Sequence, residues 1–527
     1  MIRPLAIHKF GGTSLGDAAR IEAAAEILRA ASRRERVVAV VSATAGTTDA
    51  LLAAARDAQR GRTSSWRASV AGLRDRHLAL AERFEGRKGR ASAVARTSGL
   101  ASRAGVSSRA GRRSPAAPGR HGGATFLVIE ALLEELETAL SGISLLRELS
   151  DRSLDAVASF GERLVAPIVA EALRARGVPA AAVDARRIVR TDDRHGRATA
   201  DLAATGAAAR RTLRSVLARG TLPVVTGFIA SGPRGETTTL GRSGSDTTAA
   251  ILGAVLGAVR IVIWTDVDGV HSADPRLVKG TRVLRRLTYR EAAELTYFGA
   301  RVLHFPAMIP AIAARIPIVI QNSFRPAEPG TTISGSRPGR TTGIAAVTSI
   351  RGLALVSLEG KGMVGIPGIA ARAFSAVARE KVSVLMFSQA SSEQNICLVV
   401  PEDDRARSLR ALREEFAAEM VLGKLDGVRS HGPVAAVAAV GEGMRGTPGI
   451  AARVFSEVAA VGVNVEAIAQ GSSEVNISFI VEDADAPAAV AAVHRLCVAG
   501  ADARGAPNGI ARQRRVRGSR RRSPGAA

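Results

Sequence analysis

Sulfur and aromatic side chains are scarce in this sequence of 527 residues. It contains two cysteines, Cys397 and Cys497, and only 3% of its residues are Phe, Trp or Tyr. Two cysteines so far apart provide neither a disulfide framework nor a cysteine metal cluster, which favours a reducing, cytoplasmic location. With so few aromatic residues, the hydrophobic cores must consist largely of Ala, Val, Leu and Ile.

Long apolar runs are missing as well. The apolar stretches are short and interrupted by charge, so none has the roughly 20 residues that a membrane-spanning helix needs. The N-terminus passes at once into a strand-like run and lacks the pattern of a signal peptide. We therefore expect no membrane partner, and the length of 527 residues predicts about two to four globular domains.

Acidic residues are fewer than basic ones. The sequence has 48 Asp and Glu and 73 Lys and Arg, which gives a net charge of +25. Residues 60–120 and 500–527 together carry +19 of this excess. Both stretches are rich in Arg, Gly, Ser and Ala with little period. We therefore expect an irregular basic insertion over 62–123 and a disordered basic tail over 498–527, or a shifted reading frame in the coding DNA. Neither has interleaved aromatics or a recognition helix, so no nucleic-acid partner is expected.

Apart from that insertion, strand-like and helix-like segments alternate over the first 334 residues. The first strands are expected over 5–10 and 36–41, with a Gly-rich loop and a helix (18–31) between them. Further helices are expected over 125–140, 163–176, 198–219 and 289–297, and further strands over 180–183, 223–230, 259–264 and 316–321. This alternation is typical of a parallel sheet, so we predict one α/β domain over 1–334.

The central stretch of that domain is TTTLGRSGSDTTAA, residues 237–250. It lies between two strand-like runs and combines an open backbone at Gly241 and Gly244 with Arg242 and Asp246, four residues apart. A turn of this kind at the carboxyl edge of a parallel sheet is where α/β enzymes bind small anionic ligands. The alternative is a solvated loop in which a Ser-Asp pair caps the following helix.

The remaining sequence carries an internal repeat. GKGMVGIPGIAARAFSAVAREKVSV from Gly360 matches GEGMRGTPGIAARVFSEVAAVGVNV from Gly441, at an offset of 81 residues. Each copy contains a G-x-G-x-x-G, but the repeat is too short for a dinucleotide-binding unit and a proline stiffens each turn. We predict two small α+β domains in tandem, residues 335–432 and 433–497, that present backbone groups to a small ligand.

Several long motifs, taken in order, resemble the aspartate kinases of the amino-acid kinase family. They are KFGGTS from Lys9, SFGE from Ser159, TTLGRSGSD from Thr238, TDVDGV from Thr265 and YFGARVLH from Tyr297. The repeats resemble the ACT effector domains of bifunctional aspartate kinase–homoserine dehydrogenases. The resemblance implies a three-layer αβα sandwich with a mostly parallel sheet, followed by tandem ferredoxin-like ACT units. It also implies ATP-dependent phosphorylation of the L-aspartate side-chain carboxylate, the first step of lysine, threonine and methionine biosynthesis.

Roles for individual residues follow from the same resemblance. Lys9, with Gly11 and Gly12, would meet the phosphates, and Asp246 would orient Lys9 or hold the substrate amino group. Arg242 would grip a substrate carboxylate in bidentate fashion and Glu162 would pair with the ammonium. The other expected contacts are Thr48 for the substrate and Thr265, Asp266, His271, Arg276, Arg301 and Val302 for ATP, with Lys9, Asp246 and Arg301 as the catalytic residues. Mg²⁺ should travel with ATP rather than occupy a protein cage.

Two positions depart from the family pattern. His271 stands where the family usually has Tyr, and Arg301 stands where it usually has Lys. Because Arg keeps the charge of Lys but not its shape, a catalytically impaired amino-acid-binding regulatory protein is the alternative to an active enzyme. Gln389 and Gln470, at matching places in the two repeats, are expected to bind an amino-acid effector, threonine or lysine, in a homo-oligomer.

Overall fold

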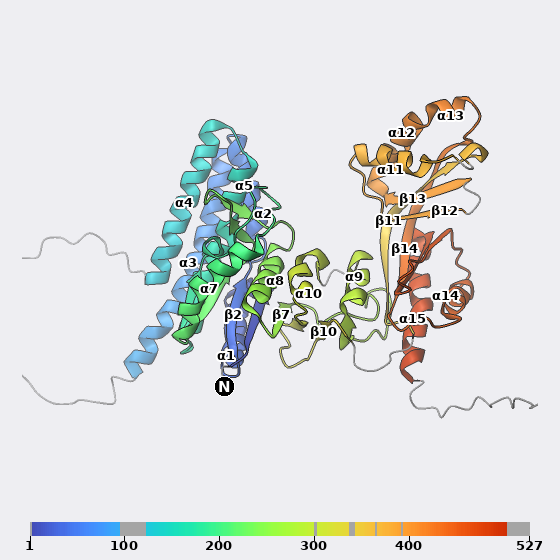
Figure 1. Cartoon of the computed structure of the whole chain (residues 1–527). Helices are drawn as coiled ribbons and strands as arrows, with labels where there is room; N and C mark the ends of the chain where they lie inside the picture. The colour runs from blue at the N-terminus through green and yellow to red at the C-terminus, as the bar shows by residue number, and fades with distance from the viewer. Residues whose placement is uncertain are drawn as a thin grey trace, which may run out of the picture.

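The computed structural model describes residues 3–94, 123–299, 303–336, 343–363, 366–390 and 394–502. Two bodies lie side by side, an α/β domain and a body that contains both repeats, with helix α9 (Tyr289–Tyr297) between them (Figure 1). The predicted α/β domain and the predicted α+β units are therefore confirmed. Within the described residues, no helix is both long and apolar enough to cross a membrane.

An eight-stranded sheet forms the centre of the α/β domain. Its strands lie in the order β3 (Ala180–Val183), β4 (Leu222–Thr226), β2 (Arg36–Val41), β1 (Leu5–Phe10), β7 (Arg260–Thr265), β9 (Ile318–Asn322), β10 (Thr331–Ser334) and β8 (Arg286–Thr288). Neighbouring strands run parallel, except that β9 and β10 are antiparallel. Lys9 lies near the carboxyl end of β1, in register with Val40 on one side and Ile263 on the other.

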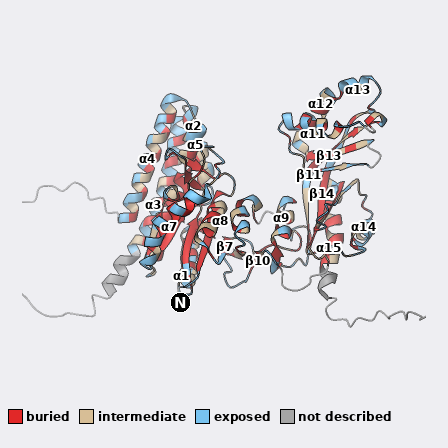
Figure 2. Ribbon diagram, in the orientation of Figure 1, coloured by how far each residue is buried: buried red, intermediate tan, exposed pale blue. Residues whose placement is uncertain are grey.

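Helices cover both faces of this sheet, so that its strands are largely buried (Figure 2). One face packs against α1 (Ala18–Ser32), α2 (Thr47–Gln59), α4 (Ala124–Leu146) and α6 (Phe160–Arg174), and the other against α7 (Leu202–Ala218), α8 (Gly244–Leu256) and α10 (Ile309–Ala313). Side chains alternate between the faces along β1: Ile7 packs on the α8 side and Phe10 on the α6 side. Lys9, two residues after Ile7, therefore faces α8.

The predicted strand over 223–230 is interrupted. β4 ends at Thr226, and a short hairpin of β5 (Ile229–Ser231) and β6 (Thr237–Thr239) follows. The interruption lies where α8 approaches closely, because a Cβ at Gly227 would lie 2.5 Å from Ser245 Oγ. Phe228 adopts a left-handed φ of 67° at this point. The hairpin leads the chain to the 239–246 loop, the central stretch of the sequence.

The expectation of an irregular insertion over 62–123 is wrong for its first half. Residues Thr63–Val94 form one helix, α3, which packs against α2 and α4. Its buried side chains are Trp66, Val70, Leu73, His77, Leu80, Ala81 and Phe84. Most of these follow one another in steps of three and four, which make a single stripe on a helix, while the abundant arginines conceal the stripe in the composition. Residues 95–122 lie outside the described part of the chain.

The second body is built on one antiparallel sheet of six strands. Their order is β12 (Met386–Gln389), β13 (Asn395–Pro401), β11 (Ala346–Glu359), β14 (Gly427–Val440), β16 (Asn476–Glu482) and β15 (Ala467–Ala469). Helices α11 (Ile369–Arg379) and α12 (Arg405–Glu415) pack on the half formed by the first repeat, and α14 (Ile450–Ala459) and α15 (Ala486–Asp502) on the half formed by the second. Because α15 continues to Asp502, the tail expected from residue 498 is helical at its start; residues from 503 on lie outside the described chain.

The two repeats exchange part of a strand. Residues 346–350 of β11 pair with 436–440 of β14, and Val347 belongs to the hydrophobic core of the second repeat. Residues 353–359 of the same strand pair with β13 of the first repeat. The second repeat is thus completed by chain that precedes the first, so the repeats are interleaved rather than strictly sequential.

Contacts from both repeats converge on α9 and on the loop that follows β7. The hydroxyl of Tyr297 donates to the backbone oxygen of Leu385 (2.6 Å), and Ala273 and Val278 of the loop belong to the core of the second repeat. Ser272 Oγ and His494 Nε2 of α15 are hydrogen bonded at 2.8 Å, and both side chains are buried. The loop after β7 therefore packs as part of the second repeat.

Candidate active site

A cavity of about 630 Å³ opens at the carboxyl ends of β1, β2 and β4. Its walls are the loop after β2, the first turn of α2, helices α5 (Asp151–Ala158) and α6, and the 239–246 loop. Open α/β sheets bind their ligands at this edge. The structure brings together eight residues singled out from the sequence: Lys9, Gly12, Thr48, Glu162, Gly241, Arg242, Gly244 and Asp246.

Lys9 and Asp246 form an ion pair in the cavity wall. Lys9 Nζ lies 2.6 Å from Asp246 Oδ1, and the two side chains are only 11% and 13% exposed. Asp246 occupies the first turn of α8, so the helix fixes the carboxylate that holds the ammonium. At Gly12 a Cβ would lie 2.8 Å from Ala43 O, so the loops after β1 and β2 can approach this closely only with glycine there. The Lys9 ammonium is thus held in a fixed position at the sheet edge.

The turn that carries Arg242 has a strained backbone. Gly241 (φ 71°) and Ser243 (φ 56°) adopt the left-handed conformation on either side of it. A left-handed conformation is costly for a non-glycine residue, and residues held in such conformations cluster at functional sites. Among the described residues, no carboxylate pairs with the Arg242 guanidinium. Its five donors are therefore available for an anionic ligand in the cavity.

Asp155 is a buried residue of the cavity wall that the sequence analysis missed. Its carboxylate accepts hydrogen bonds from the hydroxyl of Thr239 (2.6 Å), from the backbone of Gly196 (3.0 Å) and from His195, whose Nδ1 lies 2.9 Å away. These bonds join α5 to the 192–200 loop and to the strand that leads into the Arg242 turn. The signal in the sequence is one acidic residue seven positions before Glu162, which is too common to interpret.

Glu162 lies in the first turn of α6 and is enclosed by protein. Its Oε1 accepts a hydrogen bond from the backbone N–H of Ala43 (3.1 Å), and its Oε2 is buried with no hydrogen-bond partner among the residues that the structure describes. Burial raises the pKa of Glu162 to about 8. A cationic ligand group beside the free oxygen would stabilise the ionised carboxylate.

Of the predicted ATP contacts, Lys9 and Gly12 line the cavity, whereas Thr265, Asp266, His271 and Arg276 do not. Thr265 ends β7, and the backbone N–H of Gly11 donates to Trp264 O (3.3 Å), so Thr265 and Asp266 share the sheet edge with Lys9. Farther along, His271 Nδ1 lies 3.2 Å from Thr281 Oγ1. Arg276 pairs with Asp274 at 2.6 Å, with its side chain 80% exposed. The structure therefore leaves Arg276 in a surface ion pair outside the cavity.

The remaining predicted site residues belong to the YFGARVLH motif and to the repeats. Arg301 and Val302 lie outside the described residues. Gln389 ends β12 and Gln470 directly follows β15, and both are exposed. Each therefore lies on an edge strand of the six-stranded sheet, at an equivalent place in the two repeats.

Comparison with known proteins places these features in a family. The sequence matches the model of the Amino acid kinase family over residues 4–322 and that of the ACT domain over residues 356–416 and 437–496. It is 34% identical to the bifunctional aspartokinase/homoserine dehydrogenase 2, chloroplastic, of Arabidopsis thaliana, over 93% of this chain and 50% of that protein. The chain spans about half the length of the curated relatives that head this comparison.

Solved structures give the same result over the whole fold. Aspartokinase III of E. coli in complex with aspartate and ADP has a TM-score of 0.71 at 29% identity, covering 94% of this chain and 100% of that one. The same enzyme in complex with lysine and aspartate has a TM-score of 0.70 at 30% identity, covering 93% and 99%. The similarity therefore extends across both the α/β domain and the interleaved repeats.

Proposed function

Because the chain belongs to the amino acid kinase family, we propose that it transfers the γ-phosphoryl group of ATP to the side-chain carboxylate of L-aspartate, forming 4-phospho-L-aspartate. The observation that carries this proposal is the buried Lys9–Asp246 ion pair in one cavity with Glu162 and Arg242. The names of the relatives and the aspartate and ADP bound to E. coli aspartokinase III support it.

An amino-acid substrate with two carboxylates and one ammonium suits the charges of the cavity. The Arg242 guanidinium would hold a carboxylate through two parallel hydrogen bonds. The free oxygen of Glu162 would accept from the ammonium, and the hydroxyl of Thr48 lies on the same wall. The acceptor carboxylate would then lie toward Lys9, where the phosphoryl group arrives.

ATP would approach from the side of Thr265 and Asp266, with Lys9 on the transferring phosphoryl group. Phosphoryl transfer depends on positioning and on stabilising charge, which a fixed ammonium supplies. The N-terminus of α8, a helix of 13 residues, lies at the same place and adds the positive end of its dipole. Mg²⁺ would be held by the phosphates and water, since it keeps its waters and prefers phosphate oxygens.

The reaction would open lysine, threonine and methionine biosynthesis, with an amino-acid effector bound to the repeats near Gln389 and Gln470. Lysine bound to E. coli aspartokinase III makes lysine the first effector to test, and threonine the second. We include a homo-oligomer in the proposal, since ACT units present edge strands that can pair. We also place the activity in the cytoplasm, which suits two free cysteines.

Hydroxylamine trapping tests the activity directly. The purified protein with ATP, Mg²⁺ and aspartate should produce an acyl phosphate, which hydroxylamine converts into a coloured hydroxamate. Lys9→Ala should abolish this signal while leaving the far-UV circular dichroism unchanged. If the wild-type protein forms no more hydroxamate than Lys9→Ala, the proposed kinase activity is contradicted, and the catalytically impaired, amino-acid-binding alternative is favoured.

A further inference from the structure

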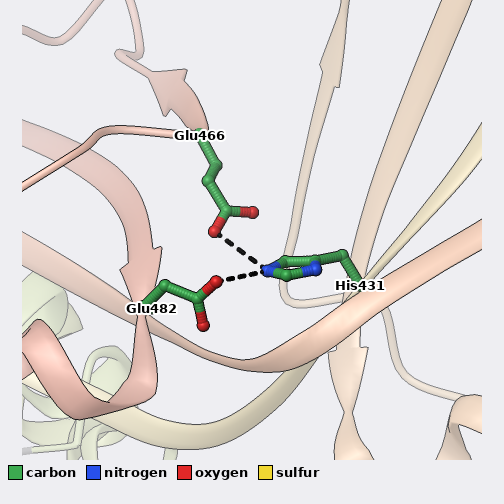
Figure 3. A group of neighbouring side chains, drawn as sticks. All are labelled: His431, Glu466 and Glu482. Carbon is green, nitrogen blue, oxygen red and sulfur yellow. Dashed lines mark hydrogen bonds and ion pairs between the residues drawn. The ribbon is translucent and has the colours of Figure 1, made fainter.

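Three metal-binding side chains meet on the sheet of the repeats, outside the cavity. His431 of β14, Glu482 at the end of β16 and Glu466 just before β15 point toward one another (Figure 3). His431 Nε2 lies 2.7 Å from Glu482 Oε1 and 3.3 Å from Glu466 Oε1. The three ligand atoms all lie within 4.8 Å of one another. Strands from across the second repeat thus bring one imidazole and two carboxylates to one point.

The imidazole cannot satisfy both carboxylates. Its Nε2 carries at most one hydrogen, yet it faces an oxygen of Glu466 and an oxygen of Glu482. Among the described residues, no Lys or Arg pairs with either carboxylate, and the nearby Arg351 is bound to Asp483 instead. With a neutral imidazole, the cluster carries two uncompensated negative charges. A cation at its centre would bond all three groups.

The separations suit a small transition-metal ion. Zn²⁺ binds imidazole nitrogen and carboxylate oxygen at about 2.0–2.2 Å with tetrahedral angles, which place neighbouring ligand atoms about 3.3 Å apart. The contact between His431 and Glu466 already has this length, and the contact between His431 and Glu482 needs to widen by about 0.6 Å. The side chains of His431 and Glu482 are 52% and 49% exposed, which leaves room for water as a fourth ligand.

The first repeat provides an internal comparison for this cluster. At the offset of 81 residues, His431, Glu466 and Glu482 correspond to Ile350, Leu385 and Pro401. Strand pairing supports this correspondence. Val434 of β14 pairs with Glu482 of β16, and the residues 81 positions earlier, Leu353 of β11 and Pro401 of β13, pair in the same way. Ile350 and Leu385 pack against the hydrophobic core. One place in the duplicated sequence is therefore apolar in its first copy, and in its second copy it holds three side chains that can bind a metal.

We infer that His431, Glu466 and Glu482 bind a divalent transition-metal cation, Zn²⁺ above all, with one coordination position left to water. One nitrogen and two oxygen ligands suit Zn²⁺, whereas Mg²⁺ and Ca²⁺ prefer oxygen ligands alone. The bound ion would tie β14 and β16 to the start of β15. That strand ends next to Gln470, so the site lies within the unit that we expect to bind the effector.

Metal binding by the full chain tests this site. After chelation, equilibrium dialysis should show one more equivalent of Zn²⁺ on the wild type than on His431→Gln. Co²⁺ should give visible absorption bands on the wild type that are absent from this variant. Glu466→Gln and Glu482→Gln should weaken the binding at least tenfold, since even outer groups of a metal site contribute about 10–100-fold. Equal stoichiometry and affinity in all four proteins would overturn the inference.

A matched control separates the cluster from the general surface charge. Glu457 lies on α14 of the same repeat, where it pairs with Arg495 at 2.7 Å outside the cluster. Glu457→Gln should bind Zn²⁺ as the wild type does. If Glu457→Gln loses as much Zn²⁺ as Glu482→Gln, the binding is non-specific and the inference fails. Zn²⁺ should also raise the unfolding temperature of the wild type and not that of His431→Gln or Glu482→Gln, which checks the result with two separate variants.

Discussion

The two sides of the candidate active site are held in place by different parts of the molecule. On the side proposed for the substrate, Lys9 is paired with Asp246, and Asp155 binds the strand before the Arg242 turn. All of these groups belong to the α/β domain. On the side proposed for the nucleotide, the loop after β7 packs into the second repeat, where Ser272 is hydrogen bonded to His494.

Because of this difference, we expect catalysis and its regulation by an effector to depend on different parts of the molecule. A ligand that shifts the second repeat would act first on the loop after β7, and so on ATP binding, because a ligand shifts an equilibrium only through groups that differ between the two states. The pocket proposed for aspartate, which is supported within its own domain, should respond less. Substitutions on the substrate side should therefore change catalysis and aspartate binding, and those on the nucleotide side the response to the effector.

The largest effect is expected for Asp246→Asn. This change removes the charge that holds Lys9 and leaves a largely buried ammonium without its partner. We expect kcat to fall by about 10²–10³-fold, the range found when one stabilising group is lost. Steady-state rates of hydroxamate formation measure it. A kcat within threefold of the wild type would show that Asp246 does not orient Lys9. The matched control is Asp49→Asn, which changes another acidic residue of the cavity wall.

Glu162→Gln should act on aspartate binding and its pH dependence. Because the pKa of Glu162 is about 8 in the free protein, the carboxyl is largely protonated at pH 7 and gains its charge as the pH rises. The wild-type KM for aspartate should therefore fall between pH 6.5 and 8.5. In Glu162→Gln the KM should be about 10-fold higher at pH 8.5, the loss of one hydrogen bond between charged groups, and should not vary with pH. An equal slope in both proteins would assign the titration to another group.

The same carboxyl has a consequence for stability. Its pKa in the folded chain, about 8, is higher than the ordinary value of 4.5. Between these two values the folded state binds a proton that the unfolded state has released. The free energy of unfolding should thus decrease as the pH rises from 4.5 to 8, by at most about 1.4 kcal/mol per pH unit. Urea unfolding of the wild type should show this slope, and Glu162→Gln should lose it.

Asp155→Asn should have a smaller effect than either change. The amide keeps an acceptor oxygen but loses the charge, and its NH₂ group faces donors on Gly196 and Thr239. We expect the Arg242 turn to loosen and the KM for aspartate to rise about 5–10-fold, with kcat less affected, since the lost bonds are worth about 1–1.5 kcal/mol. An unchanged KM for aspartate would show that the turn keeps its position without Asp155. Thr199→Ala, in the neighbouring loop, is the control, since the backbone N–H of Thr199 donates to Asp192 and not to Asp155.

The sequence was most informative where a pattern repeats or a motif is long. The strand around Lys9 and the helix over 289–297 were predicted with the bounds that the structure shows, because a short apolar run that ends in glycines is typical of a buried strand and an apolar stripe of an amphipathic helix. Helix α3 was missed because arginine and serine between Trp66 and Phe84 hide a stripe that becomes plain only when its steps are counted.

Long-range partners could not be predicted from the sequence. Asp155 became visible only when folding brought it against Gly196 and Thr239, which lie 41 and 84 residues away. His431, Glu466 and Glu482 have no metal-binding spacing, since strand pairing alone joins them. The pairing of residues 346–350 with β14 could not be predicted from the repeat either. The offset of 81 identifies residues at equivalent positions, but it does not identify residues in contact.

The smallest effect is expected where the nucleotide side meets the second repeat. His494→Gln removes the buried imidazole bonded to Ser272, and a single hydrogen bond of about 0.5–1.5 kcal/mol can carry a coupling of about 2–10-fold. The effector concentration for half-inhibition should shift by that factor, and the KM for ATP should change while the KM for aspartate and kcat do not.

Arg495→Gln is the matched control, since Arg495 is the next residue of α15 but pairs with Glu457 on α14. If both variants shift inhibition equally, α15 influences the enzyme through its general stability. If His494→Gln instead changes the KM for aspartate, the two sides of the site are coupled inside the α/β domain, and the contrast between them fails.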